Sequence, residues 1–258
     1  MVRSEKNKGF GQACNLGVSH AKAKIILFLN TDVEVKEGFL EPIPQHFKDP
    51  DVFAVRINVL HPLRKSSPEQ VVYFFWEVRY GLVRASHEIF NDQRKVEKEC
   101  AHVGGSHGAV SKEKFLELSG FDELYRPIYM EDVDLSYRAL KRGWKINYEP
   151  QSVIIHKGGG TMQRYFKRNY TDFLGERNQY LFFWKNISDT RIFLSHFFWM
   201  PFRLFGPLFV GNFIPLRAFC MALVRVPELL RRRGEERKYC RVRDQEIFQK
   251  FGRARLSP

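Results

Sequence analysis

One short stretch, residues 25–32, constrains the fold more than any other part of the sequence. Five consecutive apolar residues, Ile25–Leu29, run directly into Asn30, Thr31 and Asp32. A run that is apolar on both faces is typical of a central strand in a parallel sheet that helices cover. Ligands of open α/β sheets bind outside the carboxyl ends of the strands, so Asp32 would stand where a metal-bound phosphate can sit. An ordinary Asn/Asp turn after the strand is the alternative interpretation.

Size and charge limit the function classes. The chain has 258 residues, 44% of them hydrophobic, which is enough for one core plus an appendage. Its formal net charge of +13 indicates an anionic partner: nucleic acid, an acidic membrane surface or a phosphorylated small substrate. The sequence has no recognisable helix-turn-helix, RNP or zinc pattern, so we expect no nucleic-acid partner.

The cysteines and the N-terminus favour a cytoplasmic setting. The four cysteines are scattered without Cys-x-x-Cys spacing, which indicates neither a zinc site nor a disulfide framework. The first ten residues contain basic side chains but no apolar core of a secretory signal.

A helix is predicted over residues 11–23, just before the apolar run. Gly9 and Gly11 at its start let the backbone approach a neighbour, and a helix N-terminus attracts anions. A plain turn at these glycines is the alternative. Further along the chain, the patterns predict a short helix over 39–47, a strand over 52–60, a helix over 112–118 that Ser111 caps, and strands over 145–149 and 152–155.

A second chemical site is predicted at the head of a helix that begins at Glu131. Glu131, Asp132 and Asp134 crowd its first turn, and Gly143 supplies its stop. Acids at a helix N-terminus are favoured by the macrodipole, which is a purely structural explanation. Capping does not need three acids, however, and a carboxylate there is well placed as a general base.

His156 is the third candidate. It ends the predicted strand over 152–155 and precedes three glycines, Gly158 to Gly160. This arrangement indicates a flexible flap over a site, with His156 as a metal or phosphate ligand.

The composition changes after residue 164, where arginines and lysines interleave with aromatic residues. The apolar region 193–224 is interrupted by prolines, arginines, His196 and Asn212, so it lacks the roughly 20 clean residues of a membrane-spanning helix. An amphipathic hairpin that docks on anionic lipid fits this composition. A helical appendage packed on the core fits it equally well.

The ordered motifs resemble glycosyltransferase family 2, especially its bacterial rhamnosyltransferase-like members. They are Asn7-Lys-Gly9-Phe-Gly11 with Asn15 and Gly17, Leu27-Phe-Leu-Asn-Thr-Asp32, Gly120-Phe-Asp-Glu123, Glu131-Asp-Val-Asp-Leu135, Gly143-Trp144 and Ile155-His156. The resemblance covers residues 7–161, and its specificity lies in order and spacing.

The resemblance implies an α/β fold of the GT-A (Rossmann-like) type, with a mixed sheet flanked by helices. We expect a partial GT-A domain over 1–163 and a helical, basic and aromatic region over 164–258 that contacts the membrane interface.

The resemblance also implies the residue roles. Asp32 and His156 would hold Mg²⁺ or Mn²⁺, and Asn30, Gly9 and Asn15 would belong to the cofactor-binding positions. Asp132 would be the catalytic base, and Glu131 would orient the reactants. The donor would be a nucleoside diphosphate sugar, with a rhamnose-like sugar as one candidate. The sugar would pass with inversion to a glycan or lipid-linked acceptor in cell-surface polysaccharide synthesis, at the cytoplasmic face of the membrane.

The chain departs from this family at its beginning. Family members start with a strand-helix-strand-helix portion that reads the nucleotide, whereas here the first predicted element is the helix before the Asp32 strand. We therefore expect an N-terminally truncated domain with an unpaired sheet edge and little transferase activity on its own. A catalytically impaired fragment, or an accessory subunit that keeps the acceptor half, is the alternative function.

Overall fold

The computed structural model describes residues 7, 9–60, 71–90, 98–104, 107–156 and 166–252. The predicted flap at Gly158 to Gly160 lies outside these residues. The elements, in chain order, are α1 (Phe10–His20), β1 (Ile25–Leu29), β2 (Val33–Val35), α2 (Ile43–His46), β3 (Val52–Leu60), β4 (Val71–Arg79), β5 (Leu82–Phe90), β6 (His107–Ser111), α3 (Lys112–Glu117), η3 (Glu123–Tyr125), α4 (Glu131–Lys141), β7 (Lys145–His156), α6 (Arg168–Asn186), α7 (Thr190–Phe205), η4 (Gly206–Val210), α8 (Ile214–Val224), α9 (Val226–Arg237) and α10 (Asp244–Phe251).

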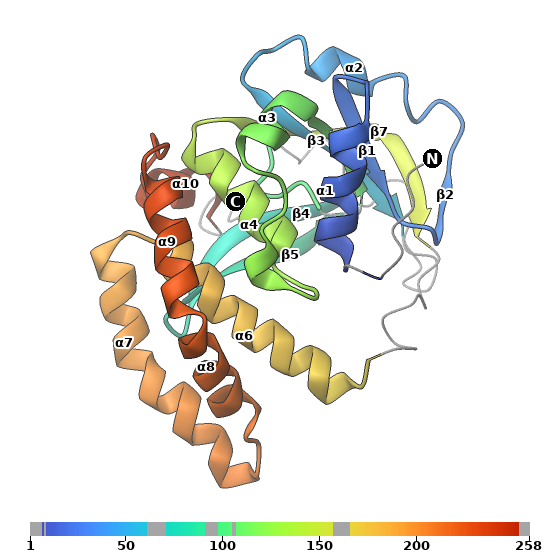
Figure 1. Ribbon diagram of the computed structural model, residues 1–258. Coiled ribbons are helices and arrows are strands. Elements are labelled where there is room, and N and C mark those ends of the chain that lie inside the picture. The colour runs from blue at the N-terminus through green and yellow to red at the C-terminus, as the bar shows by residue number, and fades with distance from the viewer. Residues whose placement is uncertain are drawn as a thin grey trace.

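The central sheet is mixed, with the strand order β1-β6-β3-β7-β2. Strands β1 and β3 both pair antiparallel with β6, and β3 pairs parallel with β7. Strands β1, β3 and β7 therefore point the same way, and their C-terminal ends lie along one side of the sheet, where β6 and β2 begin. This side is called the strand-end edge. The predicted mixed α/β fold flanked by helices is confirmed (Figure 1).

Strand β1 corrects one prediction, because it is an edge strand of this sheet and not a central strand of a parallel sheet. Its only strand partner among the described residues is β6, which runs antiparallel. The apolar run arises because both faces of β1 are covered. Ile26 and Phe28 pack into one core cluster, and Ile25 and Leu27 pack against a second cluster on the other face. Burial on two faces does not reveal how many strands flank the run.

Strand β7 corrects a second prediction, because it runs as one strand through both predicted segments. Its register with β3 shifts between the pairs Ile57↔Glu149 and Asn58↔Val153. Pro150 falls inside this irregularity, where a missing backbone N–H interrupts no ladder bond.

Strands β4 and β5 form a separate hairpin whose turn is Tyr80 and Gly81, both with positive φ. The aromatic run before the turn contributes Phe75 and Trp76 to the core. A Cβ at Gly81 would lie 2.7 Å from Ser195 O, so glycine lets this turn press against α7.

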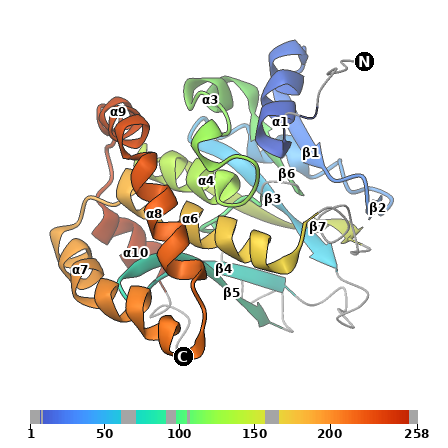
Figure 2. The same cartoon turned by 60° about the horizontal axis from the view of Figure 1, so that its bottom comes forward.

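The C-terminal helices pack on the same core as the sheet. One cluster of buried residues runs from Val18 in α1 to Phe251 in α10. Helix α6 crosses the molecule beside α4 and β5, and α7 and α8 extend away from the sheet as a hairpin (Figures 1 and 2). The predicted division at residues 163 and 164 stays a prediction, but both regions share this core.

Candidate active site

Asp32 and His156 meet at the strand-end edge. Asp32 lies in the turn between β1 and β2, and His156 is the last residue of β7. Because Val33 pairs with His156 in the β2–β7 ladder, the two side chains are neighbours, and Asp32 Oδ1 lies 3.2 Å from His156 Nε2. The sheet thus brings together two residues that are far apart in the sequence.

His107 joins this group from β6. It pairs with Leu29 at the end of β1, and its ring centroid lies 5.0 Å from that of His156, in an edge-to-face arrangement. The glycine-rich surroundings of His107 show no ligand spacing, so its place in this group could not be predicted from the sequence. The described residues contain no group of three or more His, Cys, Asp or Glu side chains arranged to hold a metal ion.

A carboxylate oxygen and an imidazole nitrogen nevertheless suit Mn²⁺, and the carboxylate suits Mg²⁺. Asp32 and His156 fit a cation that takes its other ligands from water and a diphosphate. Their roles as metal ligands stay predictions.

The head of α4 is held in an unusual backbone conformation. Tyr129 and Met130, which precede Glu131, both have positive φ, of 71° and 75°. Such conformations are uncommon for residues other than glycine and persist where surrounding contacts enforce them. Asn178 of α6 supplies those contacts, because its Nδ2 lies 2.7, 2.8 and 2.9 Å from the carbonyl oxygens of Tyr125, Ile128 and Tyr129, which share its two N–H donors.

Asp132 lies at this helix head in contact with a buried histidine. His102 Nε2 is 3.3 Å from Asp132 Oδ2, and the His102 ring packs 5.1 Å from that of Phe74. Ser136 fixes both segments, because its Oγ donates to Asp132 O and accepts from Val103 N. Sequence reasoning missed His102, since no spacing or motif connects it with an acid 30 positions later.

Arg56 places a buried positive charge in the same region. Its guanidinium lies 4.0 Å over the Phe74 ring and donates to His102 O at 3.5 Å. Burial lowers the pKa of Arg56, while the negative charge of Asp132 opposes this shift. The charge of Asp132 therefore acts on this buried cation.

Glu131 holds its proton more strongly than an ordinary glutamate. Burial, followed by the negative charge of Asp132, raises the pKa of Glu131 to about 8. Glu131 also contributes to raising the pKa of the Cys14 thiol, although burial is the larger cause. Near neutral pH, Glu131 therefore keeps its proton, and of these two acids Asp132 is the one suited to act as a base.

Asp134, the third acid of the motif, is structural. It is fully buried and accepts from Arg138 Nε at 2.6 Å, Lys185 Nζ at 2.8 Å and Tyr125 Oη at 2.7 Å. Burial alone would raise its pKa, but the two cations hold the pKa of Asp134 well below its usual range. The three acids of one helical turn thus have three different environments.

A short segment connects the two acidic centres. Gly108, next to His107 on β6, lies against Val103, and a Cβ at Gly108 would be 2.7 Å from Val103 Cγ2. Val103 is the residue after His102, and its backbone N–H donates a hydrogen bond to Ser136 Oγ. Contacts therefore run continuously from Asp132 through His102 and β6 to the strand-end edge that carries Asp32.

A cleft of about 610 Å³ opens beside Asp132. Helix α4 supplies one wall with Glu131 and Asp132, and β5 and α6 supply the other with Arg84, Glu176 and Gln179. Its mixed polar lining suits a hydroxyl-rich molecule.

Two predicted cofactor-binding residues have structural contacts of their own. Asn15 Nδ2 donates to Phe121 O at 2.8 Å, and Asn15 Oδ1 accepts from Phe121 N at 2.9 Å. Gly9 precedes α1 with a φ of 83°, and a Cβ there would lie 3.1 Å from Pro127 O. Asn30 directly follows β1 at the strand-end edge, as Asp32 does. Cofactor binding by these three residues stays a prediction.

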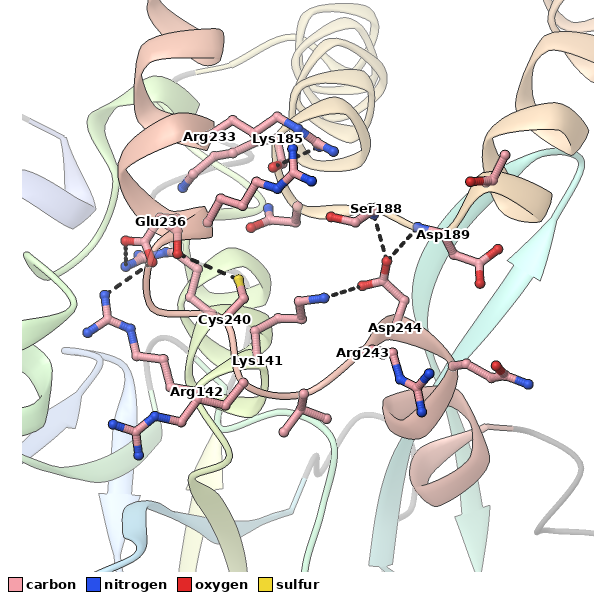
Figure 3. A pocket seen from close by; sticks show the side chains of 17 residues that line it. Lys141, Arg142, Lys185, Ser188, Asp189, Arg233, Glu236, Cys240, Arg243 and Asp244 are labelled. Atoms are coloured by element: carbon pink, nitrogen blue, oxygen red, sulfur yellow. Dashed lines mark hydrogen bonds and ion pairs between the residues drawn. The ribbon is translucent and has the colours of Figure 1, made fainter.

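A pocket of about 470 Å³ at the opposite end of α4 is rich in cations (Figure 3). Ion pairs lie within it, among them Lys141 with Asp244 and Arg142 with Glu236. Lys141 Nζ lies 2.9 Å from Asp244 Oδ1, and Asp244 Oδ2 accepts from Ser188 N and Asp189 N at 2.6 and 2.8 Å. These contacts fasten α10 to α4 and to the start of α7, which is a structural role.

The comparison with protein families agrees with this geometry. The model of "Glycosyl transferase family group 2" matches residues 25–230, which is most of the chain. The chain belongs to this family. The matched residues include the strand that leads into Asp32, the helix that begins at Glu131 and the first C-terminal helices.

Curated proteins that are similar in sequence to this chain are named as glycosyltransferases. The pre-mycofactocin glycosyltransferase of Mycobacterium tuberculosis is 26% identical over 152 residues, covering 58% of this chain and 30% of the relative. The human polypeptide N-acetylgalactosaminyltransferase 6 is 27% identical over 171 residues, covering 60% and 27%. The chain thus spans less than a third of the length of these two curated relatives.

Two solved structures of glycosyltransferases are also similar. GalNAc-T7 with UDP, GalNAc and Mn²⁺ has a TM-score of 0.49 and 18% identity, covering 70% of this chain and 35% of that one. The mannosyltransferase PcManGT from Pyrobaculum calidifontis, in complex with GDP-Man and Mn²⁺, has a TM-score of 0.45 and 14% identity, covering 88% and 57%.

Proposed function

We propose that this family group 2 chain transfers a sugar from a nucleoside diphosphate sugar to an acceptor hydroxyl, with a divalent cation and with inversion. The observation that carries the proposal is the arrangement of Asp132. It lies at the head of a fixed helix, beside a cleft and in contact with buried His102, while contacts through β6 lead to Asp32 and His156. The names of the relatives support the same reaction class.

The chemistry divides between the two centres. At the strand-end edge, Asp32 and His156 would hold Mg²⁺ or Mn²⁺, which when bound neutralises charge on the diphosphate. In the cleft, Asp132 would accept the proton of the acceptor hydroxyl. The acceptor oxygen forms a bond to the anomeric carbon as the bond from that carbon to the diphosphate oxygen breaks, and the electron pair leaves with the diphosphate. A single displacement of this kind inverts the configuration.

The other side chains support Asp132. His102 would hold its carboxylate in one orientation, and Arg56 would favour its charged form. Glu131, which keeps its proton near neutral pH, would act as a hydrogen-bond donor that orients a reactant and not as a second base.

We extend the proposal to the sugar, the acceptor, the pathway and the cellular location. A rhamnose-like sugar, a glycan or lipid-linked acceptor, a role in cell-surface polysaccharide synthesis and peripheral attachment to the cytoplasmic face of a membrane fit the sequence motifs and the net charge of +13. The exposed aromatic residues of α7 and η4 also support membrane contact.

The test is transfer and hydrolysis of a panel of nucleoside diphosphate sugars with Mn²⁺, comparing the chain with its Asp132→Asn variant. Removal of a general base typically costs about 10² to 10⁴-fold in rate, so the variant should lose transfer by that factor. Glu113→Gln, in an exposed position of α3, is the matched control. Transfer that Asp132→Asn leaves unaffected would mean that another group is the base, whereas no transfer by either chain would favour the accessory-subunit alternative.

A further inference from the structure

The hairpin formed by α7, η4 and α8 exposes the largest apolar surface of the described residues. Phe209 and Val210 at its tip are 92% and 82% exposed. One face of α7 continues this surface along the helix. The lipid-facing ridge, as we name it here, comprises Leu194, Phe197, Phe198, Phe202, Phe205, Phe209, Val210 and Phe213. Exposed apolar patches of this extent mark interaction surfaces.

The opposite face of α7 is fixed to the protein. His196 is fully buried, its Nδ1 lies 2.9 Å from Gly81 O, and Trp184 Nε1 donates to its Nε2 at 3.1 Å. Its ring stacks on Phe183, with centroids 4.3 Å apart. Leu204 is also buried, and Met200 packs against the core. Helix α7 therefore packs one face against the protein and exposes an apolar face to solvent.

The charges of the hairpin are of one sign. No aspartate or glutamate occurs from Thr190 to Pro227, while four arginines do. Arg203 and Arg225 pair with Glu176 and Glu228, which lie outside this stretch. Arg191 and Arg217 have no ion-pair partner within the part of the chain that the structure describes. An acid-free apolar surface bordered by arginines complements an anionic lipid bilayer.

We propose that the hairpin inserts the lipid-facing ridge into one leaflet of an anionic bilayer and does not cross it. This deepens the membrane contact of the proposed function but does not depend on the transfer chemistry. Contrary to the expectation from the sequence, residues 190–210 are long and apolar enough to span a membrane by length and composition, and only 11% of their apolar window is buried. A spanning position would remove His196 from Gly81 and Trp184 and place Arg203 in the hydrocarbon.

A second copy of the chain is the competing occupant of the ridge. Pairing two ridges would bring arginines of equal charge together without an acid from either hairpin. Lipid phosphates neutralise these arginines, which favours the bilayer.

The hairpin is also connected to the cleft beside Asp132. Arg203 of α7 lies 3.3 Å from Glu176, and Arg84 lies 3.9 Å from the same carboxylate. Both Arg84 and Glu176 line the cleft. Docking through the ridge would therefore hold the cleft close to the lipid surface.

Co-flotation with vesicles tests the docking. The wild-type chain should float with phosphatidylcholine vesicles that contain about one third phosphatidylglycerol, and less with pure phosphatidylcholine. The triple variant Phe198→Ser, Phe202→Ser and Phe209→Ser should bind at least about tenfold more weakly, because each phenylalanine loses apolar burial. The control, Leu40→Ser with Leu116→Ser, removes exposed apolar side chains elsewhere and should float like the wild type.

The outcomes separate the alternatives. A wild-type chain that stays in the soluble fraction, or a triple variant that floats normally, overturns the proposal. So does a wild-type dimer in solution that the triple variant converts to a monomer without any vesicle binding. Asp32→Asn should float normally, so a failure of the transfer chemistry is distinguishable from a failure of docking.

Thiol labelling at the tip tests insertion into a single leaflet. Val210→Cys is placed in a background of Cys220→Ser and Cys240→Ser, which removes the two exposed thiols. Burial raises the pKa of the remaining Cys14 and Cys100 thiols to about 12 and about 11, so they react slowly. An impermeant maleimide trapped inside the vesicles should not label Cys at position 210, and labelling from inside overturns the single-leaflet position.

Discussion

His102 Nε2 lies 3.3 Å from Asp132 Oδ2, and the Ser136 hydroxyl hydrogen-bonds to the backbone of Asp132 and to that of Val103, the residue after His102. The buried imidazole contacts Asp132 Oδ2, and Val133 N donates to Asp132 Oδ1 at 2.9 Å, so the two contacts together restrict the rotation of the carboxylate beside the cleft. We interpret His102 as a positioning residue for the proposed base.

The first prediction concerns this contact. His102→Phe keeps a ring of similar size against Phe74 but removes the nitrogen, so we expect kcat to fall about 10- to 100-fold, as is usual when a group that orients a catalytic ligand is lost. KM for the donor should change little. His102→Asn, which restores a donor, should recover part of the rate, and the pH profile of kcat should differ between the two variants. Equal kcat values for the wild type and both variants would contradict the positioning role.

The second prediction concerns the metal. Asp32→Asn and His156→Ala should each weaken Mn²⁺ binding at least about tenfold in the presence of a nucleoside diphosphate, because each removes one of two protein ligands. Calorimetry or Mn²⁺ paramagnetic resonance measures this directly, without any turnover. Glu37→Gln, an exposed acid in the loop after β2, is the control. If all three variants bind Mn²⁺ equally, the metal site lies elsewhere.

The third prediction follows from the raised pKa of Glu131, which burial and Asp132 bring to about 8 from an ordinary value of 4.5. The folded state keeps this proton while the unfolded state loses it above about pH 4.5. Folding stability therefore falls as the pH rises from about 4.5 to about 8, by up to about 1.4 kcal/mol per pH unit.

Glu131→Gln removes this dependence. Urea unfolding at several pH values should show the variant gaining stability relative to the wild type as the pH rises from 5 to 8. A constant difference over this range would mean that Glu131 is ionised in the folded state.

The fourth prediction concerns Asp134, which holds two buried cations, Arg138 and Lys185. Asp134→Asn leaves both partly uncompensated and should lower the free energy of unfolding by about 3 to 5 kcal/mol. Because the pKa of Asp134 is depressed in the folded state, the stabilisation is present above about pH 4 and is lost in acid. Asp49→Asn, which breaks the exposed pair with Lys145, should change unfolding little.

Local signals predicted two helix ends, whereas the helices expected over residues 11–23 and 39–47 span Phe10–His20 and Ile43–His46. Ser111 accepts a hydrogen bond from Lys114 N at the start of α3, as its sequence position predicts, and Gly143 follows α4 with positive φ. These signals work because a cap is made by residues only a few positions apart.

Non-local relationships were not predictable in the same way. The apolar run of β1 identified a strand, but its place at the edge depends on pairing with β6, more than 70 residues later. That Asp32 and His156 would come together was implied by the family resemblance and not by any local spacing. His102 was missed because its importance comes from α4 packing on the segment before β6, which leaves no trace in local spacing.

Asn178 has a consequence for engineering. This single amide in α6 holds three carbonyl groups of the loop that leads into α4, so the segment that carries Asp132 takes its shape from a helix on the other side of the predicted boundary. A chimaera joined at residue 164 would exchange this support along with the C-terminal helices. If the substituted helices lack an asparagine at this position, the loop before α4 loses its anchor, and the failure of such a graft would be misread as a general incompatibility of the two parts.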